Sequence, residues 1–183
     1  MSTDRREILL SIARATISCA LNIPRSADES APWLTDAAAC FVTLTQHGQL
    51  RGCIGSLEAH RSLLADLKAN ALAAALHDPR FMPLTAAELG YTRIEISLLT
   101  PPLAMHFCDE ADALSQLRPG VDGVIFEFGR FRSTFLPQVW EQLPQPQQFM
   151  AQLKRKAGLP ADFWNKDVTL SRYSVTKFIE DNQ

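Results

Sequence analysis

The 183-residue sequence contains no run that approaches the roughly 20 consecutive apolar residues of a membrane-spanning helix. It also lacks the apolar core of a secretory signal, because charged residues such as Arg6, Glu7 and Arg14 interrupt its N-terminal region. Neither sign of charge dominates, and the formal net charge of -2 gives no general attraction to nucleic acid or anionic membranes. We therefore expect a cytoplasmic protein with no membrane partner.

Cysteine is scarce, and the four that occur are far apart in the sequence: Cys19, Cys40, Cys53 and Cys108. None forms a C-x-x-C pair, and the cysteines and histidines show no zinc-ligand spacing. The sequence therefore predicts reduced thiols and no metal site. A P-loop and a G-x-G-x-x-G fingerprint are absent as well, so no cofactor is expected.

One cluster of like charges does occur, at Lys154, Arg155 and Lys156. The three cations fall in the last turn of a predicted helix, where the helix dipole favours positive charge. We interpret them as a solvated helix end, because the tryptophans are scattered and form no stacking platform for bases. Nucleic-acid binding is the less favoured alternative, and the sequence leaves it open.

The spacing of apolar residues predicts short helices among hairpin strands. The first helix has Asp4 as its N-cap, and Thr85 with Glu88 forms a capping box further along. Helices are predicted over residues 4–21, 62–77, 109–117 and 147–157, and strands over 39–45, 49–54, 91–99, 124–128, 131–135 and 168–173. Strands and helices do not alternate regularly as they do in parallel βαβ units. This order therefore indicates an α+β fold with an antiparallel sheet flanked by helices.

The segment Leu50–Gly55, LRGCIG, places glycines on both sides of a cysteine within a predicted strand. Glycine weakens a strand, so it usually marks a bulge or the close approach of another backbone or a ligand. If the strand is regular, Leu50 and Gly52 face the core, and Arg51 and Cys53 face the opposite side.

The strand 91–99 alternates in the same way, with aliphatic residues on the core face and Glu95 and Ser97 between them. Burying both aliphatic sets together predicts that Arg51, Cys53, Glu95 and Ser97 share one face and form a polar pocket. The alternative is an ordinary cross-strand ion pair between Arg51 and Glu95, with Cys53 as a small buried filler.

Cys53 is also a candidate nucleophile, which would need a lowered thiol pKa that the positive charge of Arg51 or Arg80 favours. No histidine can be placed beside it from the sequence, so no general base is assigned. Asp78–Phe81, DPRF, presents Arg80 on a rigid turn as a clamp for an anion. The alternative is a helix stop with a local contact between Asp78 and Arg80.

Several segments resemble, in order, the blocks of the AMMECR domain family: Leu50–Gly55, Asp78–Phe81, Glu95–Ser97, Gly123–Val124, Phe135–Val139 and Lys156–Leu159. The resemblance extends over nearly the whole chain and implies a single AMMECR-type domain over residues 1–183. It implies two lobes, with the N- and C-terminal segments sharing the larger one and a smaller α/β lobe beside it. It also implies partners, a Memo-family protein and a radical-SAM protein, in the AmmeMemoRadiSam system.

Three functional hypotheses follow. The first is a binding or accessory module with a ligand or partner groove lined by the LRGCIG strand, and the second is a cysteine-dependent enzyme that uses Cys53. The third is a component of nucleotide or RNA modification, which the resemblance suggests. The residues assigned to ligand or partner binding are Arg51, Gly52, Gly55, Asp78, Arg80, Glu95 and Ser97, and the candidate catalytic residue is Cys53. The sequence assigns neither a substrate nor an oligomeric state.

Overall fold

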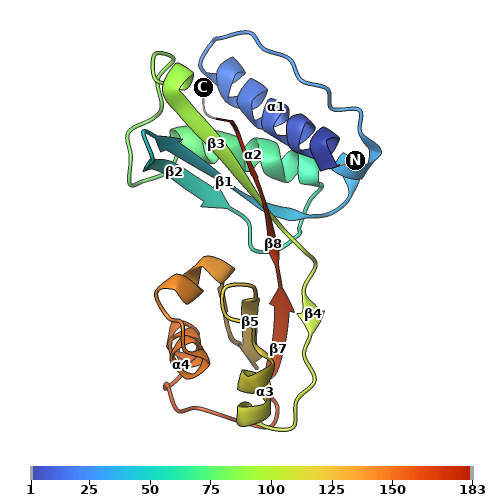
Figure 1. Ribbon diagram of the computed structural model, residues 1–183, viewed down its shortest axis with the longest axis vertical. Helices are drawn as coiled ribbons and strands as arrows, with labels where there is room; N and C mark the ends of the chain where they lie inside the picture. The colour runs from blue at the N-terminus through green and yellow to red at the C-terminus, as the bar shows by residue number, and fades with distance from the viewer. Residues whose placement is uncertain (1, 182–183) are drawn as a thin grey trace. The chain divides into compact units, whose positions relative to one another are not determined.

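The computed structural model describes residues 2–181, which form two compact units (Figure 1). The first unit contains the chain up to Leu99 and resumes at Thr176, and the second is Thr100–Val175. The described residues form four α-helices and two antiparallel four-stranded sheets. The predicted α+β class is therefore confirmed. None of the helices within residues 2–181 is long and apolar enough to cross a membrane.

The sheet of the first unit has the strand order β2-β1-β3-β8. The two central strands bury every second side chain, among them Val42, Leu44, Ile94 and Ile96. This alternation is that of a sheet with one covered face. The strands are β1 (Ala39–Gln46), β2 (Gln49–Gly55), β3 (Thr92–Leu99) and β8 (Val175–Ile179).

Two helices, α1 (Ser2–Ala20) and α2 (Leu63–Leu76), cover the apolar face of this sheet (Figure 1). The helix α2 begins where the Ser62 side chain accepts a hydrogen bond from the Ala65 amide at 3.3 Å, and it ends before Pro79. The predicted N-cap Asp4 lies within α1, and its side chain is outside the described part of the chain.

Buried Arg14 of α1 joins three segments that are distant in the sequence. Its Nε donates to Glu180 Oε1 at 2.6 Å, and its terminal nitrogens donate to the carbonyl oxygens of Leu89 at 3.1 Å and Thr92 at 2.7 Å. Glu180 also accepts the Ile94 amide at 2.8 Å. The residue after β8 is thereby fixed to α1 and to the start of β3.

The sheet of the second unit has the strand order β4-β7-β5-β6. Its core is aromatic: Trp140 stacks on Phe149 with ring centroids 3.8 Å apart and planes 5° apart, next to buried Phe126. The elements are β4 (Leu103–Ala104), α3 (Glu110–Gln116), β5 (Gly123–Phe128), β6 (Phe131–Phe135), α4 (Pro146–Lys156) and β7 (Thr169–Tyr173). Short 3-10 turns are η1 (Pro32–Thr35) and η2 (Leu89–Tyr91) in the first unit and η3 (Pro137–Glu141) in the second.

The interpretation of the Lys154 cluster as a solvated helix end is wrong for Lys154 itself. This side chain is 2% exposed, and its ammonium donates to Glu110 at 2.6 Å and to the Phe163 carbonyl oxygen at 2.9 Å. The sequence pattern placed the three cations at a helix end, but only the packing of α3 against α4 brings a carboxylate close enough to bury one of them.

The glycine at position 52 allows α2 to pack directly on β2. A Cβ atom added there would lie 2.1 Å from the Ala74 carbonyl oxygen, which belongs to helix backbone and cannot rotate away. We predict that Gly52→Ala lowers the free energy of unfolding by about 1–3 kcal/mol or more, because helix and strand must separate. Urea unfolding measures this loss.

Gly90→Ala is the matched control. A Cβ at Gly90 would meet no atom within 4 Å, and Gly90 is not among the glycines with positive φ. This variant should change the free energy of unfolding by less than about 1 kcal/mol. Equal losses in the two variants would contradict a specific close approach at Gly52.

Candidate functional site

The LRGCIG strand is interrupted by a β-bulge at Arg51. In the pairing of β1 with β2, Leu44 lies opposite Gly52 and Thr45 lies opposite Leu50, so that Arg51 has no partner residue. A bulge changes which side chains share a face, because the alternation slips by one residue. Leu50 therefore lies on the face of Thr45, and the expectation that it faces the core with Gly52 is wrong; its side chain is exposed.

Arg51 reaches toward the helix-covered side of the sheet, where it pairs with Glu88. Its Nε lies 3.0 Å from Glu88 Oε1. Glu88 also accepts from Gln46, which donates in turn to buried Thr92 at 2.9 Å. Gln46 and Thr92 alternate along their strands with Thr45 and Arg93, which lie on the other face of the sheet. The expected common face of Arg51 and Glu95 is therefore wrong. The alternative, an ion pair between them, is wrong as well, since Arg51 pairs with Glu88 and Glu95 pairs with Lys177 at 3.0 Å.

The carboxylate of Glu88 is held by several donors besides Arg51. It accepts the Thr85 amide at 2.8 Å and the Thr85 hydroxyl at 2.9 Å. The half of the predicted capping box in which Glu88 caps the Thr85 amide therefore forms, but the Thr85 hydroxyl donates to Glu88 instead of accepting its amide, and the segment opens a turn and no α-helix. The hydrogen bond from Arg51, followed by those from Thr85, lowers the pKa of Glu88 to about 2. Glu88 stays ionised and anchors the Arg51 side chain.

Cys53 lies on the other face of the sheet, at one end of a row of polar residues. Thr43 is opposite Cys53 on one side and opposite Glu95 on the other. The Cys53 Sγ lies 3.2 Å from the Thr43 hydroxyl oxygen. In the next row, Phe41 is opposite both Gly55 and Ser97, and its ring fills the space that a Cβ at Gly55 would need.

We call this surface the open face, because α1 and α2 lie on the opposite face of the sheet. Its side chains are half-buried or exposed, in contrast to the buried positions that alternate with them. It consists of Phe41, Thr43, Thr45, Leu50, Cys53, Gly55, Arg93, Glu95 and Ser97. Of the predicted polar pocket, the structure thus brings together Cys53, Glu95 and Ser97, and it places Arg51 elsewhere.

Asp78 and Arg80 cover the backbone of Cys53 at the edge of the sheet. The Cys53 amide donates to Asp78 Oδ2 at 2.9 Å, and Arg80 Nη2 donates to the Cys53 carbonyl oxygen at 3.2 Å. Arg80 Nη2 also donates to Asp78 at 2.7 Å, and this hydrogen bond holds the pKa of Asp78 well below its usual range. The pair therefore occupies the backbone groups that a neighbouring strand would otherwise use.

The hydrogen bond of the Cys53 thiol within the described residues is to a hydroxyl group. Within residues 2–181, its hydrogen-bond partner is the Thr43 hydroxyl, and no histidine there donates to it or accepts from it. The nearby guanidinium of Arg80 is already neutralised by Asp78. In the described part of the chain, no group of three or more His, Cys, Asp or Glu residues is placed to hold a metal ion.

A second polar network, not anticipated from the sequence, surrounds Cys40. The buried carboxylate of Asp66 in α2 accepts from the Cys40 amide at 2.9 Å, Ser56 at 2.6 Å, Arg61 at 2.8 Å and Asn70 at 2.9 Å. Burial, followed by the charge of Asp66, raises the pKa of the Cys40 thiol well above its ordinary value. This network fastens α2 to β1 and leaves Cys40 unreactive.

Comparison with known proteins links this geometry to one family. The AMMECR1 family model matches residues 10–178. A protein of Methanothermobacter thermautotrophicus is 36% identical over 99% of this chain and 97% of its own length, and protein MJ0810 of Methanocaldococcus jannaschii is 36% identical over 92% and 86%. The crystal structure of the uncharacterized protein PH0010 from Pyrococcus horikoshii is similar with a TM-score of 0.77 and 30% identity, covering 96% of this chain and 91% of that one.

The ion pair of Glu88 predicts a specific dependence of stability on pH. The folded state lowers the pKa of Glu88 from 4.5 to about 2, so its ionised form stabilises the fold above pH 4.5. This contribution is lost as the pH falls from 4.5 towards 2. We predict that Glu88→Gln is less stable than the wild type at pH 7 by about 1–3 kcal/mol, and that the difference shrinks below pH 4.5.

Urea unfolding at a series of pH values between 7 and 2.5 measures this difference. Glu127→Gln is the control, because Glu127 forms a surface ion pair with Arg132 in which both side chains are 45% exposed. Its effect should be small at every pH. A deficit in Glu88→Gln that is the same at pH 7 and pH 3 would contradict the assignment.

Proposed function

The chain belongs to the AMMECR1 family, and we propose that it is a cytosolic binding or accessory domain on whose open face a partner protein docks. The single observation that carries the proposal is the arrangement of Cys53, Glu95 and Ser97 on a sheet face that the helices of the first unit leave uncovered. The open face combines exposed Leu50 with polar and charged side chains. Such mixed composition is typical of the surfaces by which separately folded proteins associate.

The remaining motif residues stabilise the strand that carries this face without lying on the face themselves. Gly52 brings α2 against β2, and Asp78 and Arg80 fix the backbone of Cys53 from the sheet edge. Arg51 braces the bulge through Glu88. The motif would then act in binding through the shape and rigidity of the strand, while Cys53 and the Phe41 ring that covers Gly55 contact the partner. A rigid surface loses little conformational entropy on association, which favours affinity.

The partners that we propose are those that the family resemblance implies, a Memo-family protein and a radical-SAM protein. The alternatives remain an enzyme that uses Cys53 and a component of nucleotide or RNA modification. A cysteine enzyme needs a thiolate stabilised by a neighbouring base or positive charge. The contacts of Cys53 favour the binding module over that alternative, because they supply a hydroxyl and an arginine whose charge Asp78 offsets.

Association with these companions tests the role of the open face. We predict that Leu50→Glu and Ser97→Arg each weaken binding to the Memo-family or radical-SAM protein at least about tenfold, because a charge enters the contact. Calorimetric titration gives the affinities. Leu103→Glu is the matched control, since Leu103 is 69% exposed but belongs to the second unit. Equal weakening in all three variants, or none in the first two, would count against docking on this face.

The reactivity of the four thiols separates the module from the enzyme. We predict that iodoacetamide at pH 7 modifies the exposed Cys19 and Cys108 first, Cys53 about tenfold more slowly, and buried Cys40 last. Access limits the reaction at Cys53, and burial also suppresses the thiolate at Cys40. Peptide mapping by mass spectrometry over time gives the four rates. Labelling of Cys53 well ahead of Cys19 and Cys108 would instead support the enzyme.

A further inference from the structure

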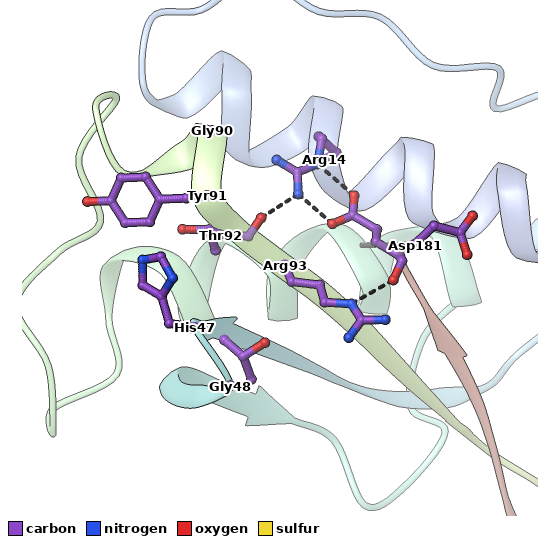
Figure 2. Close-up of a pocket in the computed structure, with 10 residues that line it drawn as sticks. Arg14, His47, Gly48, Gly90, Tyr91, Thr92, Arg93 and Asp181 are labelled. Carbon is purple, nitrogen blue, oxygen red and sulfur yellow. Dashed lines mark hydrogen bonds and ion pairs between the residues drawn. The ribbon is translucent and has the colours of Figure 1, made fainter. Parts of the chain in front are cut away.

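A cavity of about 350 Å³ opens beside the β1–β2 hairpin, where the start of β3 and the residues after β8 meet (Figure 2). Its lining includes Arg14, His47, Gly90, Tyr91, Arg93 and Glu180, all of them from the first unit. This volume is within the range of sites for small organic molecules. Arg93 also belongs to the open face, but Leu50, Cys53 and Ser97, through which the partner is proposed to dock, do not line the cavity.

One wall of the cavity is an exposed pair of aromatic rings. His47 stacks on Tyr91 with ring centroids 5.6 Å apart and planes 20° apart, and Tyr91 is 51% exposed. His47 is one of two non-glycine residues with positive φ within residues 2–181, at 50°, and Gly48 follows at 78°. The hairpin turn thus holds the His47 backbone in a conformation that most residues avoid. Figure 2 shows the two rings next to each other, to the left of Arg93.

Arg93 supplies the positive charge of the cavity. Its Nε donates to the Glu180 carbonyl oxygen at 2.6 Å, which fixes the position of the guanidinium (Figure 2). Its two terminal nitrogens have no hydrogen-bond partner among the described residues. The carboxylates of the lining are already paired, Glu180 with Arg14 and Asp181 with Arg6. Arg93 therefore presents a fork of free donors, the geometry that binds carboxylate or phosphate oxygens in pairs.

Gly90 leaves space in the cavity because it has no side chain. Neither its backbone conformation nor a close neighbour requires glycine at this position. Its φ is not in the left-handed region, and a Cβ added there would touch nothing within 4 Å. In this it differs from Gly48, whose φ of 78° requires glycine, and from Gly52, which α2 covers. The space beside Gly90 is free in the folded chain and available to a ligand.

We propose that this cavity binds a small anion that carries a planar ring, with its carboxylate or phosphate on Arg93 and its ring against Tyr91 and His47. Two features are needed together, a fixed guanidinium with free terminal donors and an exposed aromatic surface within the same cavity. An inorganic anion would use the first alone, and a neutral aromatic compound the second alone. The proposal goes beyond the docking of a protein partner and does not depend on it.

Titration of the 15N-labelled protein with four probes tests the site by amide chemical shifts. The probes are 1-naphthoate, 1-naphthyl phosphate, neutral 1-naphthalenemethanol and inorganic phosphate. We expect saturable shifts at His47, Gly48 and residues 90–93 with at least one naphthyl anion, and an affinity at least fivefold weaker for the alcohol and for inorganic phosphate. Comparison of naphthoate with naphthyl phosphate shows which anionic group the site prefers.

Two variants assign the binding to the cavity. Arg93→Gln should weaken binding of the preferred naphthyl anion about tenfold, because a charge-assisted pair of hydrogen bonds is lost. Gly90→Leu should abolish it by filling the open space. Arg155→Gln, which removes an exposed arginine from the second unit, and Ser97→Arg, which alters the proposed docking face, should leave it unchanged.

The proposal is overturned if no probe gives saturable shifts at these residues up to millimolar concentration. It is also overturned if the alcohol binds as well as both anions, or if Arg93→Gln and Arg155→Gln bind alike. Should Gly90→Leu fail to fold, as its amide spectrum would show, Arg93→Gln decides the outcome. Loss of partner binding in Ser97→Arg with intact probe binding would separate this site from the docking face.

Discussion

The buried guanidinium of Arg14 is the interaction on which the first unit depends most. It joins α1 to Glu180 and to the backbone before and at the start of β3, segments that are far apart in the sequence. A buried arginine is stable only when its donors are paired, so removing either partner would leave a charge without compensation. Because Glu180 directly follows β8, this contact also keeps the chain's last strand at the edge of the sheet and forms one wall of the cavity.

The LRGCIG motif illustrates how residues that suggest chemistry can serve the fold. Gly52 is required by the closeness of α2, and Arg51 is occupied by Glu88. Asp78 and Arg80 use their charges on each other and on the backbone of Cys53, which protects the edge of the sheet from pairing with another chain. What remains for a partner is the row through Cys53, Thr43 and Glu95. This distribution is the basis on which we propose a binding role for the strand.

The open face and the cavity lie on the same unit but differ in chemistry. The open face is a sheet surface of half-buried and exposed side chains, which we propose binds a protein. The cavity is a small hollow open to solvent, with one fixed cation and two stacked rings, and its size suits a small molecule. Both include Arg93 or its neighbours on β3, so that a ligand in the cavity would change the charge at the hairpin end of the open face. The two proposed sites are therefore adjacent and share Arg93.

The sequence by itself determined the α+β class, most helix and strand positions and the family, because local periodicity, capping residues and ordered motif blocks carry that information. It also showed the hydrogen bond by which Glu88 caps the Thr85 amide and the alternation that puts Glu95 and Ser97 on one face. Tertiary structure alone decided the bulge at Arg51, because the packing of α2 over Gly52 sets the register there. It likewise decided the partners of Arg51, Cys53 and Lys154. Those contacts join segments that are far apart in the sequence. No local sequence pattern indicates that such segments meet, because their contact depends on which elements pack together.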